Sequence, residues 1–143
     1  MTVRDGTAEW HGDVQTGSGR ITVGDAVFEG PYSFGSRFED GEGTNPEQLI
    51  AAALAGCFTM ALSNLLAEAG HPPEPLRTHA VVHLRNNDGE ISLSRIDLDT
   101  TGHVPGLAEP EFQRYGEEAK ANCPVSRALS GVPEITLTAK LES

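Results

Sequence analysis

The sequence predicts an α+β fold, because strand-forming and helix-forming segments come in separate runs instead of alternating one by one. Short apolar runs broken by glycine occupy the first 43 residues, and one long apolar helix is expected at 46–69. A two-strand pattern over 78–99 follows, and two helical segments then precede a final strand at 135–141.

The first 43 residues have the pattern of a meander of short strands. Ile21 and Val23 share one face of an alternating run, and the Gly-Asp pair at 24–25 supplies turn chemistry before the apolar pattern resumes. We therefore expect a small antiparallel sheet at this end of the chain.

The long helix has clear start and stop signals. Asn45 is a favourable N-cap, Pro46 suits the first helical position, and Gln48 stands where a capping-box side chain belongs. Gly70, with prolines close behind it, ends the helix. The predicted buried stripe follows a three- and four-residue spacing: Leu49, Ile50, Ala53, Leu54, Cys57, Met60, Ala61 and Leu65.

Small residues surround Cys57 in this helix. Gly56 costs about 1 kcal/mol of helix propensity relative to alanine, which predicts that a neighbouring element approaches closely there. A buried cysteine also packs as a small hydrophobe, so the position alone does not decide between packing and chemistry.

The second half of the chain predicts a hairpin, two helices and a strand. Residues 78–85 alternate, 86–89 form a turn and 91–99 return, with a slip in the apolar spacing after Leu93 that indicates either a bulge or a change of exposed face. Residues 110–121 have helical composition, and Cys123-Pro124 begins a shorter helix that extends to about Ser130.

Composition narrows the classes of function. The 143 residues predict a single domain, 1–143, and the formal charge of −11 argues against nucleic acid and anionic lipid as partners. The start, MTVRDGTAEWHGD, has no secretory pattern, and no stretch is expected to reach membrane-span composition, so we expect a cytoplasmic protein. Cys57 and Cys123 are then redox-active or simply buried, not a permanent disulfide.

Several kinds of site are disfavoured. The sequence has no CxxC or HExxH motif for a metal, no GxSxG serine elbow, and no GxxxxGK[ST] phosphate loop. The two thiols remain as candidate reactive groups.

A reactive thiol needs a cationic neighbour, because a cysteine with a pKa near 8.5 is only about 3% thiolate at neutral pH. Arg37 stands nearest in sequence to the start of the long helix, and Glu47 in the first turn is the natural carboxylate to orient it. Glu47 complementing the helix dipole beside a solvated Arg37 is an equally weighted alternative. Glu47 and Cys57 stand about 15 Å apart along one helix, so a second subunit with an antiparallel helix is expected to bring the pair to Cys57.

The motifs resemble those of the OsmC/Ohr family of thiol peroxidases, in its OsmC branch. The resemblance runs from AEWHGDV through PYSFGSRFEDGEGTNPEQLIAAALAGC to AKANCPVSRAL and EITLTAKL, which is nearly the whole chain. It implies an intertwined homodimer with antiparallel sheets around long central helices, and chemistry without haem, flavin or metal.

The resemblance also implies roles for four residues. Cys57 corresponds to the peroxidatic cysteine, Cys123 to the resolving cysteine, and Arg37 with Glu47 to the activating pair. The implied activity is reduction of organic hydroperoxides, and less efficiently of hydrogen peroxide, in oxidative or osmotic stress. A Cys57–Cys123 disulfide would be recycled by a dithiol, with lipoylated proteins as the implied donors.

Three alternatives stay open at this point. Cys123 starts a short helix, whose dipole would lower a thiol pKa and favour Cys123 as the nucleophile. Four apolar residues either line a pocket for organic peroxides or belong to an ordinary core: Phe34, Phe38, Phe58 and Met60. A noncatalytic small-molecule or stress-associated binding protein on the same fold, with both thiols inert, is the competing function.

Overall fold

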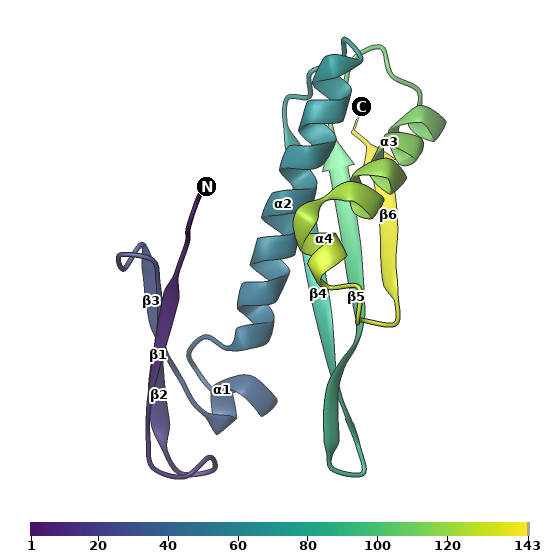
Figure 1. Cartoon of the computed structure of the whole chain (residues 1–143). Coiled ribbons are helices and arrows are strands. Elements are labelled where there is room, and N and C mark those ends of the chain that lie inside the picture. The colour runs from purple at the N-terminus through teal and green to yellow at the C-terminus, as the bar shows by residue number, and fades with distance from the viewer. Residues whose placement is uncertain (143) are drawn as a thin grey trace. The chain divides into compact units, whose positions relative to one another are not determined.

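The structure is a computed structural model that describes residues 1–142 (Figure 1). It is a mixed α+β chain, which confirms the predicted fold class. The chain forms two compact units, Met1–Leu49 and a second that begins at Ile50. The assignment of the whole chain to one domain stays a prediction.

The first unit contains an antiparallel three-stranded sheet. Its strands are β1 (Gly6–His11), β2 (Ser18–Val23) and β3 (Phe28–Tyr32), in the order β1-β2-β3. Gly24 has a positive φ of 57° in the turn between β2 and β3, as its predicted turn role requires. The meander is therefore confirmed.

A short helix, α1 (Phe34–Phe38), follows the sheet and was not predicted. The side chain of Ser33 accepts a hydrogen bond from the Ser36 backbone, and that of Ser36 accepts one from the Ser33 backbone, which forms a capping box. The sequence did not suggest a helix here because a five-residue segment with a glycine and a serine has no recognisable periodicity.

The long helix, α2, spans Pro46–Glu68 and confirms the predicted boundaries within one residue. Asn45 Oδ1 accepts a hydrogen bond of 2.8 Å from the backbone of Gln48, which is the predicted cap. Gly70 adopts a φ of 87° just after the helix, a conformation that favours glycine at this position.

The buried face of α2 differs from the predicted stripe. Its fully buried residues are Leu54, Phe58, Leu62 and Leu66, while Cys57 is only partly buried. Met60 is 77% exposed and Ala53 is exposed as well, so their predicted burial is wrong in this chain. The helix is apolar on nearly all sides, so periodicity could not single out the side that packs.

The expectation that no segment reaches membrane-span composition is also wrong. α2 has 23 residues, and its most apolar window has a mean hydropathy of 1.9. By length and composition alone, this helix could cross a membrane. Its four fully buried positions belong to the hydrophobic core of the second unit, so α2 is a core helix there.

The second unit is built on a three-stranded sheet of β4 (Leu76–Asn87), β5 (Glu90–Gly102) and β6 (Ile135–Leu141). β4 and β5 form the predicted hairpin, but β6 pairs parallel with β5, so the sheet is not antiparallel throughout. The connection through α3 (Glu109–Asn122) and α4 (Pro124–Ala128) carries the chain back along the sheet, so that β6 runs in the same direction as β5.

The irregular spacing in the hairpin is a bulge. His83 faces Arg95 and Leu84 faces Leu93, so Ser94 is the extra residue. Beyond the bulge Ile96 and Leu98 both point into the core. Of the two sequence interpretations, a bulge or a change of exposed face, the structure contains the bulge.

The exposed face of this sheet carries a polar cluster around Asp97. Its carboxylate accepts hydrogen bonds of 2.6 Å from Thr136, 2.6 Å from Arg95 and 2.8 Å from His83. These donors, Thr136 first, hold the pKa of Asp97 well below its usual range.

Candidate active site

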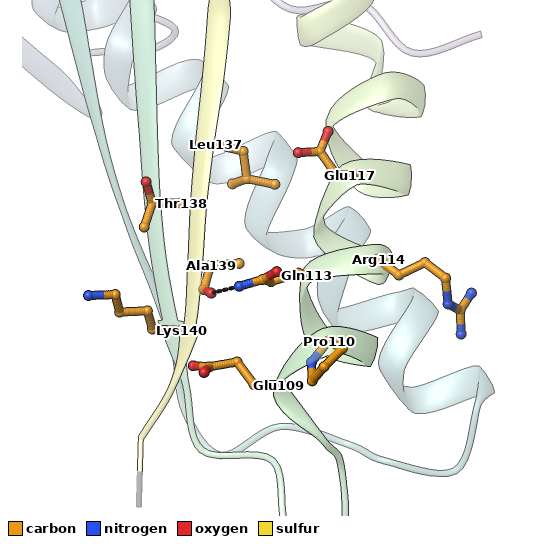
Figure 2. A pocket seen from close by; sticks show the side chains of 9 residues that line it. All are labelled: Glu109, Pro110, Gln113, Arg114, Glu117, Leu137, Thr138, Ala139 and Lys140. Carbon is orange, nitrogen blue, oxygen red and sulfur yellow. Dashed lines mark hydrogen bonds between the residues drawn. The ribbon is translucent and has the colours of Figure 1, made fainter.

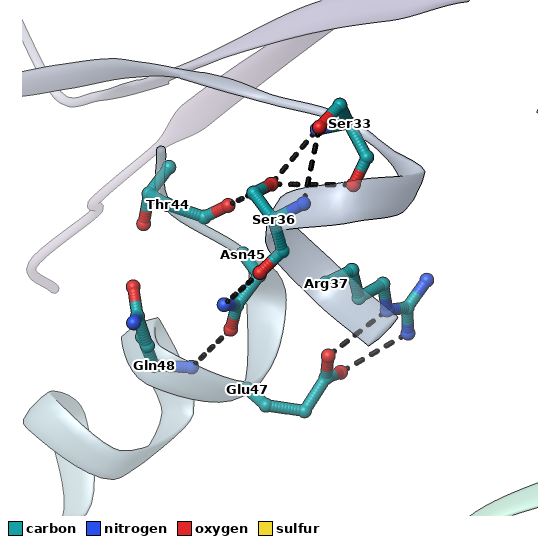
Figure 3. A network of polar contacts seen from close by, with 7 residues as sticks. All are labelled: Ser33, Ser36, Arg37, Thr44, Asn45, Glu47 and Gln48. Atoms are coloured by element: carbon teal, nitrogen blue, oxygen red, sulfur yellow. Dashed lines mark hydrogen bonds and ion pairs between the residues drawn. The ribbon is translucent and has the colours of Figure 1, made fainter. Parts of the chain in front are cut away.

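A polar network in the first unit fixes α1 against the start of α2 (Figure 3). Ser36 Oγ donates a 2.8 Å hydrogen bond to the Thr44 carbonyl, and Asn45 Nδ2 donates a 2.9 Å hydrogen bond to the Ser36 carbonyl. Ser36 and Asn45 are both buried. These hydrogen bonds fix the position of α1, the helix that carries Arg37.

Arg37 and Glu47 form a bidentate ion pair. Arg37 Nε donates to Glu47 Oε1 at 2.9 Å, and Nη2 donates to Oε2 at 3.0 Å. The Glu47 side chain is 11% exposed and that of Arg37 is 37% exposed, so the carboxylate is held in place and the guanidinium still reaches solvent. Of the two sequence interpretations, Glu47 orienting Arg37 or Glu47 beside a solvated Arg37, the structure contains the first.

Arg37 also lines a small cavity within the first unit. The guanidinium lies over the Phe38 ring at 5.2 Å, and the cavity has a volume of about 200 Å³. The remaining lining consists of Trp10, Val14, Tyr32, Ser33 and Phe34.

The predicted aromatic pocket is therefore half right. Phe34 and Phe38 line this cavity, but Phe58 is fully buried in the core of the second unit and Met60 is exposed. Trp10 and Tyr32 were missed. A signal was present, because both stand on strands that flank the one carrying Gly19, and a glycine leaves room for large side chains beside it.

The two cysteines are neighbours in the second unit. Cys57 lies in the middle of α2 and is half-buried, while Cys123 caps the start of α4 and is 1% exposed. Both are free thiols, and Cys123 Sγ accepts a 3.3 Å hydrogen bond from the backbone of Ser126. Figure 1 shows α4 beside the middle of α2.

The surroundings of Cys123 favour its protonated form. Burial is the main cause that raises the pKa of Cys123, and Cys57 raises it further through a hydrogen-bonding interaction and through its charge. The Ser126 backbone opposes this shift and is outweighed. The expectation that the helix start lowers the pKa of Cys123 is therefore wrong, because burial dominates and α4 is only five residues long.

The ion pair and the thiols are thus each assembled within a different unit. Arg37 and Glu47 belong to the first unit, and Cys57 and Cys123 to the second. On α2 itself, a side chain at Gly56 would meet nothing within 4 Å, so no element of residues 1–142 makes the close approach expected there.

A larger hollow of about 470 Å³ lies between α3 and β6 and contains neither thiol nor Arg37 (Figure 2). Side chains of α3 reach the outer edge of β6 here: Gln113 donates to the Ala139 carbonyl, and Glu109 accepts from the Leu141 backbone. These bonds occupy an edge that would otherwise pair with another strand, so we assign the hollow a structural role. Across residues 1–142, no group of three or more metal-ligating side chains occurs.

An α+β chain with two neighbouring free thiols and an oriented guanidinium has the parts of a thiol-dependent redox protein. A model of the OsmC-like protein family matches residues 39–138. The chain is 43% identical over 145 residues to Peroxiredoxin OsmC of Escherichia coli (strain K12), with 100% of both chains covered. It therefore belongs to the OsmC family.

Other relatives agree with this placement. The chain is 31% identical over 120 residues to the organic hydroperoxide resistance protein of Xanthomonas axonopodis pv. citri (strain 306), covering 80% of this chain and 78% of the relative. The crystal structure of the organic hydroperoxide resistance protein OhrB of Bacillus subtilis has a TM-score of 0.68 at 25% identity, covering 96% of this chain and 98% of that one. An OsmC structure from Legionella pneumophila matches in fold, with a TM-score of 0.70 at 21% identity and full coverage of both chains.

Proposed function

We propose that this protein is a cysteine-based peroxidase that reduces organic hydroperoxides, and hydrogen peroxide less efficiently, to alcohols or water. The observation that carries the proposal is the pairing of a half-buried Cys57 with a buried Cys123 in one unit. The peroxidase class follows from the family, and the residue roles below are our proposal.

Cys57 is the residue that attacks the peroxide. Cys57 is partly exposed, whereas Cys123 is buried and its pKa is raised. The Cys57 thiolate bonds to one peroxide oxygen, the O–O bond breaks, and the alcohol leaves after taking up a proton. Cys57 is then a sulfenic acid.

Cys123 resolves this intermediate. Once the charge on Cys57 is gone, one cause of the raised pKa of Cys123 disappears, and its sulfur attacks the sulfenic sulfur. A Cys57–Cys123 disulfide forms and water leaves.

A dithiol reductant returns both thiols to the reduced form and becomes a disulfide itself. A lipoylated protein is the donor that we propose, acting in a soluble, cytoplasmic enzyme of oxidative or osmotic stress defence. The sum is one hydroperoxide and one dithiol converted to one alcohol, one water and one disulfide.

Arg37 and Glu47 serve as the activating pair. The bidentate carboxylate fixes the guanidinium, and the remaining nitrogen, Nη1, has no hydrogen-bond partner among residues 1–142. We assign this nitrogen to the peroxide oxygen and the guanidinium charge to the support of the thiolate.

A homodimer completes the site. Glu47 and Cys57 stand about 15 Å apart along α2, so one chain does not easily supply both. α2 carries an exposed surface of small and apolar residues, Ala52, Ala53, Gly56 and Met60. An antiparallel α2 of a second copy on this surface would bring its Arg37–Glu47 pair to Cys57.

Thiol titration tests the function against the noncatalytic binding alternative. After one equivalent of cumene hydroperoxide we expect loss of both thiols per chain and formation of one alcohol. Cys57→Ser should form no alcohol, while Cys123→Ser should form one equivalent and retain a sulfenic acid. Unchanged thiols would favour a binding protein, and alcohol from Cys57→Ser but not from Cys123→Ser would reverse the two roles.

A further inference from the structure

We infer that Asn45 is a positioning residue: its side-chain amide joins the end of α1 to the start of α2 and so holds Arg37 and Glu47 in place for their ion pair. The inference rests on the proposed peroxidase function and deepens it. It gives Asn45 a second task besides the capping of α2.

The Asn45 side chain uses both halves of its amide (Figure 3). Oδ1 accepts a 2.8 Å hydrogen bond from the Gln48 backbone in the first turn of α2, and Nδ2 donates a 2.9 Å hydrogen bond to the Ser36 carbonyl near the end of α1. The start of a helix leaves N–H groups without intrahelical partners, and the end of a helix leaves carbonyls without them. One side chain therefore satisfies an unpaired backbone group at each of two helix ends.

The same two helix ends carry the ion pair. Arg37 directly follows Ser36, and Glu47 stands two residues after Asn45. The two hydrogen bonds of the pair, 2.9 and 3.0 Å long, therefore span the junction that Asn45 bridges. A bidentate contact requires both hydrogen bonds to be aligned at once, so we expect a movement of α1 away from Asn45 to misalign the guanidinium.

The loop between α1 and α2 is tight enough to bring Asn45 back to α1. A Cβ at Gly41 would lie 2.8 Å from the carbonyl carbon of Gly35, and a Cβ at Gly43 would lie 2.6 Å from the carbonyl oxygen of Pro31. Gly43 also has a φ of 124°, which L side chains rarely adopt. The two glycines therefore permit the close return that places the amide of Asn45 against α1.

Burial makes the hydrogen bond to α1 hard to replace. Asn45 is 8% exposed and Ser36 is 6% exposed, so a variant without the amide donor leaves the Ser36 carbonyl short of a partner. Serine and aspartate cap helices about as well as asparagine does. An ionised aspartate has no donor, and serine has one hydroxyl oxygen in place of the amide's oxygen and nitrogen. Both substitutions therefore retain the cap on Gln48 and remove the hydrogen bond to Ser36.

Steady-state kinetics of the full chain test the assignment. Asn45→Ser and Asn45→Asp should each lower kcat/KM for cumene hydroperoxide about tenfold, as expected for the loss of one buried hydrogen bond. Asn86→Ser is the matched control, because Asn86 is exposed in the turn between β4 and β5 and its Oδ1 accepts a 2.9 Å hydrogen bond from the Gly89 backbone. The control should stay within about twofold of the wild type.

An Arg37→Ala background separates positioning from a general structural role. A residue that acts through the guanidinium has nothing to position once the guanidinium is gone, so Asn45→Ser should cost less than about twofold there. The measurement is alcohol formation in a single turnover, with and without Asn45→Ser. A structural role would give the same tenfold loss in both backgrounds.

Hydrogen exchange followed by NMR reads the same contact without peroxide. The amides of Arg37 and Glu39 are hydrogen-bonded within the α1 segment, and their exchange should quicken about tenfold in Asn45→Ser. Exchange at Gln48 should stay within about twofold, because serine retains the cap; this amide also shows that α2 still forms in the variant.

A wild type that shows this exchange pattern against Asn45→Ser but turns over no peroxide would overturn the proposed function alone. Four results would overturn the positioning role: wild-type activity in both Asn45 variants, an equal loss in the Arg37→Ala background, unchanged exchange at Arg37 and Glu39, or equally quickened exchange at Gln48.

Discussion

Glu47→Gln isolates the orienting role of the carboxylate. The glutamine has nearly the same shape, but its amide oxygen accepts one of the two guanidinium hydrogen bonds and its NH₂ group cannot accept the other. A hydrogen bond to a charged group contributes about 1.5–3 kcal/mol. Because the Arg37 side chain is 37% exposed, solvent screening places the loss near the lower end, about 1.5 kcal/mol. The population of oriented guanidinium should then fall about tenfold.

The assay is steady-state reduction of cumene hydroperoxide with a small dithiol as the donor. We expect kcat/KM to fall about tenfold in Glu47→Gln. Glu42→Gln is the matched control, because Glu42 is an exposed loop carboxylate that forms no ion pair within the described residues, and it should match the wild type. Equal activity of the Glu47 variant and the wild type, or an equal loss in the control, would refute the orienting role.

Three further predictions concern the thiols, the sheet and the oligomer. Near neutral pH, iodoacetamide should label Cys57 well before Cys123, because burial raises the pKa of Cys123 and limits access to it; mass spectrometry of early time points checks this, and the reverse order would contradict it. In the wild type, the lowered pKa of Asp97 stabilises the fold above the ordinary carboxyl pKa, and this stability is lost as the pH falls below about 4. Asp97→Asn should remove this loss of unfolding free energy at acidic pH. Denaturant titrations at neutral and acidic pH should show this loss in the wild type and in the exposed Asp99→Asn control. Met60→Glu should give a monomer with little peroxidase activity, because the proposed dimer would bury this charge between the two α2 helices. A monomer that is fully active in sedimentation and kinetic assays at one concentration would exclude the dimeric site.

Local signals gave the best predictions of the fold. Asn45, Pro46 and Gly70 act through their own backbone and side-chain chemistry, so they located α2 within one residue. Alternation likewise located the hairpin and the final strand. Such features need no knowledge of what packs against them.

Features that depend on distant partners were missed. Nearly all sides of α2 are apolar, so the choice of Phe58 over Met60 for the core depends on where the sheet lies. The parallel pairing of β6 depends on the path through two helices, which strand patterns do not encode. The contact of Trp10 with Tyr32 depends on the register of three strands.

The candidate site divides in the same way. Charge and position gave the pairing of Arg37 with Glu47 as one of two equally weighted interpretations, and the structure contains it as a bidentate contact. The raised pKa of Cys123 did not follow from the sequence, because the helix start was visible there and the burial was not.

The reaction of Cys57 with peroxide is the most direct test of the account. In a Cys123→Ser protein the single remaining thiol is Cys57, so its single-turnover reaction with cumene hydroperoxide reports on this thiol alone. We expect one equivalent of alcohol with Arg37 intact, and a reaction at least about tenfold slower in Arg37→Ala. A Cys57 that does not react in the presence of Arg37, or that reacts equally fast in Arg37→Ala, would contradict the proposed chemistry.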